Sequence, residues 1–313
     1  MEISDFLNNV DNILFPENQN EIEQNNKTRK EEKAKKKEEF IKNHPEHFQN
    51  KEPKKDYLKY KAKERDYNRR QNAKMETYKA IKNMTKEEKE KYYDNYYNEK
   101  EIKKEKIKEN LKEGYNSNFI ICFDLDYDKY MDRREIRSLI SQLSLCYSLN
   151  KNNKKKINYY FTNITKELID KLNKNNADKW YVHFDQKPFY LIKELVDLKK
   201  EFIYLSPDAE EELEDVSEDK VYIIGGLVDR QVIKNRSMIR INNIKNGNNL
   251  DSEIKISAKR LPLKKYIDNI SNPILNINTV VEILSSFMDM EKNKKDWKKV
   301  LEYTLPKRKI DNK

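Results

Sequence analysis

The stretch "YIIGGLVDRQ", residues 222–231, is the part of the sequence that best indicates the fold. It joins an apolar run to two adjacent glycines, Gly225 and Gly226, although the 313 residues contain only four glycines. An apolar run that ends in glycine is typical of a buried strand followed by a turn or a close backbone approach. An acid, Asp229, follows three residues after the pair. The stretch therefore predicts a strand with a special feature at its carboxyl end.

Segments of the same apolar character recur on both sides of this stretch. They predict further strands at "NFIICFDLDY" (118–127), "INYYFTNI" (157–164), "WYVHF" (180–184), "EFIYLS" (201–206) and "ISAKRLPL" (256–263). Helices are expected over 131–150, with Asp132 as a cap, and over 165–174, 188–199 and roughly 208–214. Strands that alternate with helices in this way indicate an α/β fold with a mostly parallel sheet covered by helices.

The last part of the chain predicts two closing helices and one loop. The helices are expected at 278–290, capped by Asn278 or Thr279, and at 294–305. The polar, Asn-rich segment "NNIKNGNNLD" (242–251) is predicted to be a surface loop.

Residues 1–115 are interpreted as a basic extension, partly helical or disordered, in front of a domain at 116–313. Residues 21–115 hold 29 Lys and Arg against 21 Asp and Glu, with few Val, Ile or Leu, so this part cannot build a core. Within the extension, residues 84–114 predict one long helix. Thr85 and Glu88 form a capping-box pattern at its start, and Gly114 is expected to end it.

The extension interleaves basic side chains with Tyr57, Tyr60 and Tyr67. The basic residues predicted to bind RNA are Lys63, Arg65, Arg69, Arg70 and Lys74. Such residues can lie along phosphates while tyrosines stack on bases. A solvated charged helix has the same composition, and the charge alone does not decide between the two interpretations.

The charge of the whole chain indicates an anionic partner. A net charge of +10 and a pI near 9.1 favour nucleic acid over a membrane, and no apolar run is long enough to cross a bilayer. Residues 1–20 contain no Lys or Arg, which argues against a signal peptide or presequence, so the nucleus or cytoplasm is expected. Two scattered cysteines and three histidines share no metal-binding spacing, so no disulfide or metal site is predicted.

The glycine pair lies where parallel sheets usually bind ligands, at the carboxyl end of a strand. No GxGxxG or GxxxxGK[ST] motif accompanies it, so a phosphate-rich cofactor is not indicated. Two interpretations stay open: a tight turn that needs positive φ, or a close approach of the backbone to a flat ligand such as an adenosine. Asp229, like Asp124 and Asp126 after the first strand, is either a turn former or cap, or an acid of a site.

Seven short motifs, taken in order, resemble those of a known family. They are "FDLDYDKYM" (123–131), "SLISQLSLCYSLN" (138–150), "YLSPDAEEEL" (204–213), "YIIGGLVDR" (222–230), "AKRLPL" (258–263), "ILNINTVVEIL" (274–284) and "DWKKVLEYTLPKRK" (296–309). This succession resembles the tRNA (guanine-9-N1)-methyltransferase family of the SPOUT class over about residues 118–309. The resemblance implies an α/β domain with a C-terminal trefoil knot and S-adenosylmethionine as the cofactor.

The resemblance also implies the residues of the site. Asp229 would face the substrate base, with Gln142 and Asp124 as further catalytic candidates, and Gly226 would let the backbone approach the cofactor. The cofactor-binding positions that it implies are Leu205, Ser206, Gly226, Arg230, Gln231, Val232, Ile233, Lys234, Met238, Leu261, Leu275, Asn276 and Ile277.

The implied reaction is methylation of guanine N1 at position 9 of tRNA by a monomeric enzyme. Guanine N1 carries a proton at neutral pH and must lose it to attack a sulfonium methyl group, and the Asp229 carboxylate could accept that proton. Two other functions stay open. One is a tRNA-binding subunit of a processing complex without catalysis, and the other is N1-methylation of adenine at the same position, where no proton has to be removed.

Overall fold

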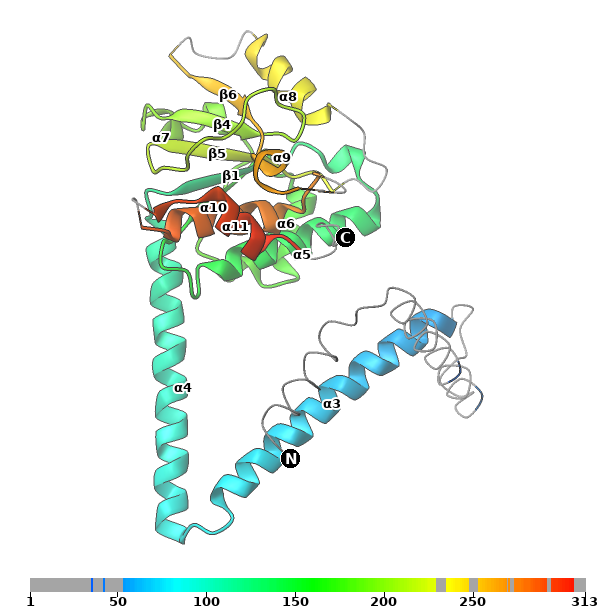
Figure 1. Cartoon of the computed structure of the whole chain (residues 1–313), viewed down its shortest axis with the longest axis vertical. Coiled ribbons are helices and arrows are strands. Elements are labelled where there is room, and N and C mark those ends of the chain that lie inside the picture. The colour runs from blue at the N-terminus through cyan, green and yellow to red at the C-terminus, as the bar shows by residue number, and fades with distance from the viewer. Residues whose placement is uncertain are drawn as a thin grey trace, which may run out of the picture. The chain divides into compact units, whose positions relative to one another are not determined.

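The computed structural model describes residues 35, 42, 53–228, 235–247, 253–268, 270, 273–291 and 294–306, with the backbone alone for 53–60 (Figure 1). The chain divides into two compact units, Met1–Asn95 and Tyr96–Lys313. The division falls within helix α4 (Lys86–Tyr115), so the domain boundary expected at 115/116 stays a prediction.

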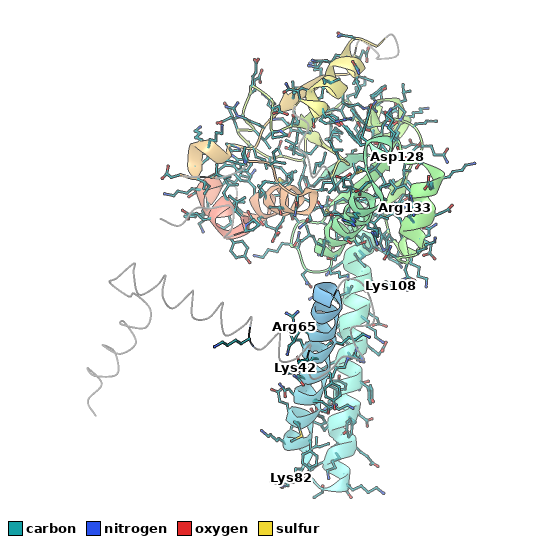
Figure 2. All side chains as sticks on the ribbon, turned by 90° about the vertical axis from the view of Figure 1, so that its right-hand side faces the viewer. Lys42, Arg65, Lys82, Lys108, Asp128 and Arg133 are labelled. Carbon is teal, nitrogen blue, oxygen red and sulfur yellow. The ribbon has the colours of Figure 1, made fainter. Side chains whose placement is uncertain are left out.

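The described part of the first unit is helical. It holds α3 (Pro53–Ile81) and the first turns of α4. Pro53 is tolerated as the first residue of α3, because N–H groups in a first helical turn have no intrahelical acceptor. The capping box predicted for α4 is confirmed: the Glu88 N–H donates to Thr85 Oγ1 (3.3 Å) and the Thr85 N–H donates to Glu88 Oε2 (2.7 Å). Figure 2 shows charged side chains along both helices, among them Arg65 on α3 and Lys108 on α4.

The second unit is built on a six-stranded parallel sheet, which confirms the predicted α/β class. The strands are β1 (Ile120–Asp124), β2 (Asn158–Thr162), β3 (His183–Phe184), β4 (Glu201–Leu205), β5 (Lys220–Gly225) and β6 (Ile256–Lys259). Their order in the sheet is β3-β2-β1-β5-β4-β6. In this register Asp124 lies level with Gly225 at the carboxyl ends of two neighbouring strands.

Both faces of the sheet are buried, as expected for parallel strands. Along β1, Ile121 and Phe123 belong to the larger core with α5 (Arg133–Leu149), α6 (Lys166–Asn173), α10 (Ile277–Asp289) and α11 (Trp297–Thr304). The alternate residues Ile120 and Cys122 belong to a second core with α7 (Lys193–Val196) and α8 (Arg236–Lys245). Figure 1 shows α5, α10 and α11 on the face opposite to α8.

Two predicted helices are corrected. Residues 208–214 are not helical, because the backbone there pairs with the segment after β6: the Leu213 N–H donates to Arg260 O and the Arg260 N–H to Glu211 O, both at 2.8 Å. The segment 188–199 holds only the 3₁₀ turn η4 (Phe189–Leu191) and the single turn α7, because Ile192 between them is extended. Tertiary pairing and an extended link thus replace the helices that local pattern favoured.

Two element ends also differ from expectation. The N-cap of α10 is Asn276, earlier than the predicted Asn278 or Thr279, so the helix begins next to the strand ends. The predicted loop 242–251 begins as the last turn of α8, which continues to Lys245, and residues 248–251 lie outside the described part. The cap predicted at Asp132 is confirmed as a full capping box with Glu135.

Gly114 does not end α4 by a left-handed turn, since no described glycine has positive φ and the helix continues to Tyr115. A Cβ at this position would overlap Nδ2 of Asn150. Asn150 is fully buried, and its amide group bonds both the N–H and the carbonyl of Ile157. The glycine is therefore needed because α4 packs tightly against the turn that leads into β2.

His183 links the end of α4 to the edge of the sheet. Its ring stacks between Tyr115 and Tyr160, with centroid distances of 4.0 and 4.1 Å. Burial lowers the pKa of His183 below its usual value, and this is opposed by the Tyr115 carbonyl and the charge of Glu194. The folded protein therefore holds this ring neutral at a pH where an exposed imidazole begins to charge.

We expect the protein to lose stability as the pH falls below about 6.5, the pKa of an unperturbed histidine. Below that pH the unfolded chain binds a proton at His183 before the folded chain does, so protonation favours unfolding. Urea unfolding at pH 7.5 and 5.5 measures the loss. In a His183→Phe variant, which keeps a stacked ring, the loss between the two pH values should be smaller. An equal loss in both proteins would contradict the assignment.

Candidate active site

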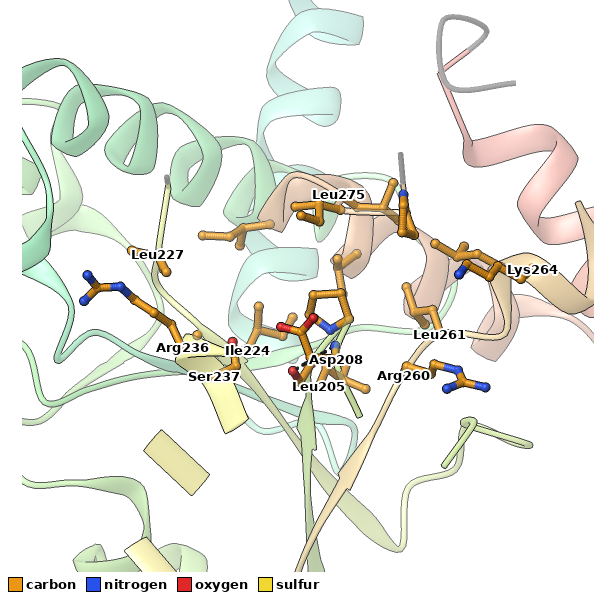
Figure 3. A pocket seen from close by; sticks show the side chains of 18 residues that line it. Leu205, Asp208, Ile224, Leu227, Arg236, Ser237, Arg260, Leu261, Lys264 and Leu275 are labelled. Atoms are coloured by element: carbon orange, nitrogen blue, oxygen red, sulfur yellow. Dashed lines mark hydrogen bonds between the residues drawn. The ribbon is translucent and has the colours of Figure 1, made fainter. Parts of the chain in front are cut away.

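A pocket of about 310 Å³ lies at the carboxyl ends of β4, β5 and β6, where parallel sheets bind ligands. Its walls come from five places in the chain: the end of β4 with the residues after it, the end of β5, the start of α8, the turn after β6, and the segment that leads into α10 (Figure 3). Most of the lining is apolar, including Leu205, Ile224, Leu261, Leu275 and Val280. Such a surface suits a flat organic ligand with few charges.

A few polar groups break the apolar lining. Ser206 is buried directly after β4, and its Oγ accepts a hydrogen bond from the Asp208 N–H (3.2 Å). Asp208 Oδ2 in turn accepts from the N–H of Asn235 (2.9 Å), the residue before α8, which adopts a left-handed conformation at φ 62°. Arg236 and Lys264 are among the basic residues of the wall. Asp208 therefore ties the turn after β4 to the start of α8 at the mouth of the pocket.

The structure brings together five of the residues that the resemblance implied for cofactor binding. Those that line the pocket are Leu205, Ser206, Leu261, Leu275 and Ile277. Three others lie outside the lining. Met238 packs against the second core, Asn276 is the residue before α10 and makes no side-chain capping bond, and Gly226 follows the pocket residue Gly225. The loop residues Asp229, Arg230, Gln231, Val232, Ile233 and Lys234 lie outside the described part.

The glycine pair is explained by close packing against the protein's own chain. Neither glycine has positive φ, so a left-handed turn is ruled out as the reason for them. A Cβ at Gly226 would overlap the Leu125 side chain and lie 3.1 Å from the Asp124 carbonyl oxygen. A Cβ at Gly225 would lie 3.3 Å from both the Tyr127 ring and the Tyr204 hydroxyl. The pair thus lets β5 and the residue after it pass close to the segment that follows β1.

Gln142 lies on α5, is buried, and contacts the start of α10, which forms part of the pocket wall. Its Oε1 accepts a hydrogen bond from the Ile277 N–H (2.8 Å), and its Nε2 donates to Ser138 Oγ (3.1 Å). Ile277 is the first residue of α10, where N–H groups lack intrahelical acceptors, and it also lines the pocket. Gln142 therefore holds the start of α10 in place, which the sequence did not indicate.

We expect Gln142→Leu to weaken ligand binding in this pocket about tenfold, because a buried N–H left without an acceptor costs about 1–3 kcal/mol. The matched control is Gln142→Glu, whose carboxylate can still accept from Ile277 at a helix N-terminus. Calorimetry with S-adenosylhomocysteine measures the ligand affinity of the two variants, and thermal melts show whether each variant is folded. Equal affinity of the wild-type and Gln142→Leu proteins would show that Gln142 does not support the pocket.

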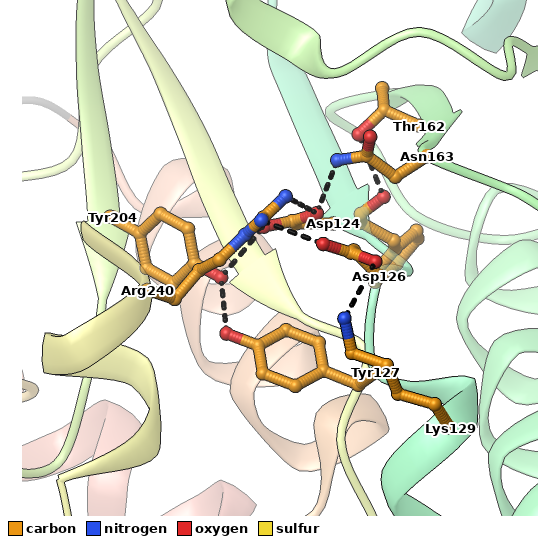
Figure 4. Close-up of polar contacts among 9 residues, drawn as sticks. Asp124, Asp126, Tyr127, Lys129, Thr162, Asn163, Tyr204 and Arg240 are labelled. Atoms are coloured by element: carbon orange, nitrogen blue, oxygen red, sulfur yellow. Dashed lines mark hydrogen bonds and ion pairs between the residues drawn. The ribbon is translucent and has the colours of Figure 1, made fainter. Parts of the chain in front are cut away.

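Asp124 is the centre of a buried polar network (Figure 4). Its carboxylate is fully buried and accepts hydrogen bonds from Asn163 Nδ2 (2.7 Å), the Tyr204 hydroxyl (3.1 Å) and Arg240 Nε (3.0 Å). Arg240 on α8 also reaches Asp126 Oδ2 through Nη1 (2.7 Å). Because its acceptor sites are taken by protein donors, Asp124 is placed as a structural anchor between β1, β4 and α8.

The protonation states of the network follow from burial. Burial raises the pKa of Tyr204, and the charge of Asp124 raises it further, so the phenol stays neutral and can donate to the carboxylate. Burial acts to lower the pKa of Arg240, but the hydrogen bond and charge of Asp124, with the charge of Asp126, outweigh it and raise the pKa. The guanidinium thus stays charged between two acids.

The residues predicted to bind RNA lie on α3, in the first unit. The five are exposed or nearly so along the helix: Lys63, Arg65, Arg69, Arg70 and Lys74. Arg69 and Arg70 both pair with Asp66 at 2.8 Å, while remaining 82% and 73% exposed. Such exposed pairs are weak and can open to a phosphate at little cost. The structure leaves their role in RNA binding as a prediction.

The charged residues that sequence reasoning missed at the site include Asp208, Arg236, Arg240 and Lys264. The motif "YLSPD" offered a signal for Asp208, because an acid directly after a strand end is a common turn or site residue. The other three carry no local signal. Among the described residues, no cluster of His, Cys, Asp or Glu could hold a metal ion, and no helix could cross a membrane.

The fold and the pocket define an α/β protein with a pocket for a small ligand at the carboxyl ends of a parallel sheet. Residues 46–310 match the model of the family "tRNA (guanine(9)-N(1))-methyltransferase TRM10/TRM10A", so the chain belongs to this family. The chain is 31% identical over 196 residues to the tRNA (guanine(9)-N1)-methyltransferase of Schizosaccharomyces pombe, and 30% identical over 200 residues to that of Kluyveromyces lactis. These matches cover 62% and 63% of this chain and 60% of each relative.

Solved structures agree with this assignment. The crystal structure of full-length spTrm10 in complex with SAH is 28% identical, with a TM-score of 0.50 over 61% of this chain and 96% of that one. The crystal structure of spTrm10(74) is 27% identical, with a TM-score of 0.51 over 61% of this chain and 95% of that one.

Proposed function

We propose that this protein is an S-adenosylmethionine-dependent methyltransferase that forms N1-methylguanosine at position 9 of tRNA. The observation that carries the proposal is the pocket. It is built from the strand ends, the turn after β6 and the segment before α10 that the family resemblance implied for the cofactor. The relatives named as tRNA (guanine(9)-N1)-methyltransferases and the spTrm10 structure with SAH support the same reaction.

The residues present fit S-adenosylmethionine. The volume of about 310 Å³ is within the range of about 300–1,000 Å³ that pockets for such ligands have. Leu205, Leu261, Leu275 and Ile277 would hold the flat adenine ring, and Asp208 could pair with an ammonium group. When bound, the cofactor supplies an electrophilic methyl group on its sulfonium sulfur.

The chain has to position guanine and remove its N1 proton. We assign the proton transfer to the carboxylate of Asp229, three residues after Gly226 in the sequence that leaves β5. Asp124 is not assigned this role, because its carboxylate already accepts from Asn163, Tyr204 and Arg240. Gln142 acts through the start of α10 instead of on the base.

The partner in this proposal is tRNA, bound by one copy of the chain. The basic side chains of α3 would contact its phosphates, and the trefoil knot implied by the family would form around the cofactor pocket. The basic charge of the chain supports an anionic partner of this kind.

Mass spectrometry of nucleosides tests the activity directly. The full chain is incubated with S-adenosylmethionine and two tRNA transcripts that carry guanine or adenine at position 9. We expect N1-methylguanosine from the first transcript alone. N1-methyladenosine from the second would favour adenine as the target, and binding of both transcripts without methylation would favour a non-catalytic tRNA-binding subunit.

We expect deletion of residues 1–84 to leave the sheet domain folded and to weaken tRNA binding. The deletion spares Thr85, the cap of α4, and every described residue of the pocket, but it removes the five basic residues of α3. The plot of log affinity against log salt should flatten, because each lost phosphate contact lowers the slope by roughly 0.7–0.9. Titrations of both proteins at several salt concentrations measure this, and equal slopes would identify the extension as a solvated arm.

A further inference from the structure

Arg236, the first residue of α8, lies at the edge of the pocket on an aromatic support. The centre of its guanidinium lies 3.9 Å from the ring centroid of Tyr130, the last residue of the 3₁₀ turn η2 (Asp128–Tyr130). The Tyr130 side chain is 50% exposed, and Lys129 Nζ lies 5.2 Å from the same ring centroid. In Figure 3 the Arg236 guanidinium is turned away from Asp208 and Leu205, toward the outside of the pocket.

The guanidinium of Arg236 has donors available for a ligand. Among the described residues, its buried Nε has no hydrogen-bond partner and its guanidinium forms no ion pair. Arg240, one turn later on the same helix, donates to both Asp124 and Asp126. Two acids of the segment that carries Tyr130 are also engaged: Asp126 pairs with Arg240 and Lys129, and Asp128 accepts from Thr165 and from the Lys129 N–H. Asp208, which lines the pocket together with Arg236, accepts from the Asn235 N–H.

This geometry suits an oxyanion ligand. A guanidinium that interacts with an aromatic ring through its face directs its N–H groups sideways, where their fork matches two oxygens of a phosphate or carboxylate. The ring of Tyr130 also holds the side chain in place before a ligand arrives, which lowers the entropy lost on binding. A buried donor without a partner is unfavourable, so an anion that supplies an acceptor recovers free energy.

We propose that Arg236, held by Tyr130, binds a phosphate of the substrate RNA beside the target nucleotide, an inference that rests on the proposed function. The carboxylate of the cofactor is the other oxyanion that could reach this pocket. The RNA phosphate is favoured because the guanidinium is turned outward and its support, Tyr130, is half exposed and does not belong to the pocket lining.

The test compares Arg236→Gln with Lys245→Gln, which removes the same charge from the last turn of the same helix. We expect Arg236→Gln to weaken tRNA binding about tenfold, as for one hydrogen-bonded charged contact. The slope of log affinity against log salt should fall by roughly 0.7–0.9, while Lys245→Gln changes both much less. Affinity for S-adenosylhomocysteine should fall much less than tRNA affinity in Arg236→Gln, because this residue lines the pocket but its guanidinium is turned away from Leu205 and Asp208. It should stay at the wild-type value in Lys245→Gln, because Lys245 is not part of the lining.

Variants at Tyr130 test the aromatic support. Tyr130→Phe keeps the ring and should bind tRNA as the wild type does, whereas Tyr130→Ala should show a loss in the direction of Arg236→Gln. Thermal melts of every variant confirm that each one is folded before titration.

Three results would overturn the proposal: equal tRNA affinity in the Arg236→Gln and Lys245→Gln proteins, a loss confined to S-adenosylhomocysteine, or a wild-type chain that binds no tRNA. The titrations do not depend on turnover. A wild-type protein that binds tRNA without methylating it would therefore contradict the proposed function alone, and one that methylates while Arg236→Gln binds normally would contradict this inference alone.

Discussion

Asp229→Asn should lower methyl transfer to guanine-9 of tRNA by about 10²-fold or more at neutral pH, the usual contribution of a positioned general base. The amide keeps the size of the side chain but cannot accept the N1 proton. Single-turnover kinetics with saturating S-adenosylmethionine measure the chemical step, and calorimetry with S-adenosylhomocysteine should give an affinity near wild type. A lower rate constant at unchanged cofactor affinity identifies an interaction made in the transition state.

Two comparisons test whether the loss of rate comes from the missing carboxylate of Asp229. The matched control is Asp268→Asn, an exposed aspartate of the same domain, which should leave the rate constant unchanged. The defect of the Asp229→Asn protein should also shrink as the pH rises, because hydroxide in solvent then removes the proton. An unchanged rate constant in Asp229→Asn would remove this residue from the catalytic machinery and leave positioning of the base as the source of the rate.

Arg240→Met should lower the free energy of unfolding by about 3–5 kcal/mol, the largest loss of stability expected from one substitution here. The reason is that Asp124 would lose its charged hydrogen-bond donor. Its carboxylate is fully buried, and without Arg240 it would lose its charged partner and have only Asn163 and Tyr204 as donors among the described side chains. Urea unfolding at pH 7.5 measures the change.

The matched control for Arg240→Met is Lys294→Met, which breaks an ion pair with Glu291 whose side chains are 71% and 73% exposed. Such a pair contributes about 0–1 kcal/mol. Asp124→Asn combined with Arg240→Met should recover part of the loss, because the buried charge is then gone. Equal losses in Arg240→Met and Lys294→Met would show that Asp124 finds other compensation.

The elements of the sheet domain could be predicted because their signals are local. Alternate residues of β1 face two different cores, so every position from Ile120 to Phe123 is apolar and the strand is visible in the sequence as a continuous apolar run. The capping boxes at Thr85 and Asp132 also lie within four residues of their partners. The same logic failed at 208–214, where the backbone of Leu213 and Glu211 bonds to Arg260, a partner that local pattern cannot reveal.

The pocket-lining residues were predictable only where a single short sequence motif forms one wall of the pocket. Leu205 and Ser206, Leu261, and Leu275 with Ile277 were found because each belongs to a short motif at a strand end or helix start. Arg240 could not be found in this way. It lies 116 residues from Asp124 in the chain, and nothing in "RSMIRINNIK" indicates that one arginine meets two acids of a distant strand.

The sequence by itself determined the α/β class, the strands and the family, because apolar runs, caps and motif order are properties of short segments. It also showed that the two adjacent glycines mattered. Only the tertiary structure decided why: Gly225 and Gly226 make room for Tyr127, Tyr204 and Leu125, which come from two other strand ends. Such close contacts arise when parallel strands far apart in the chain are brought side by side, so their residues acquire partners that no local segment contains.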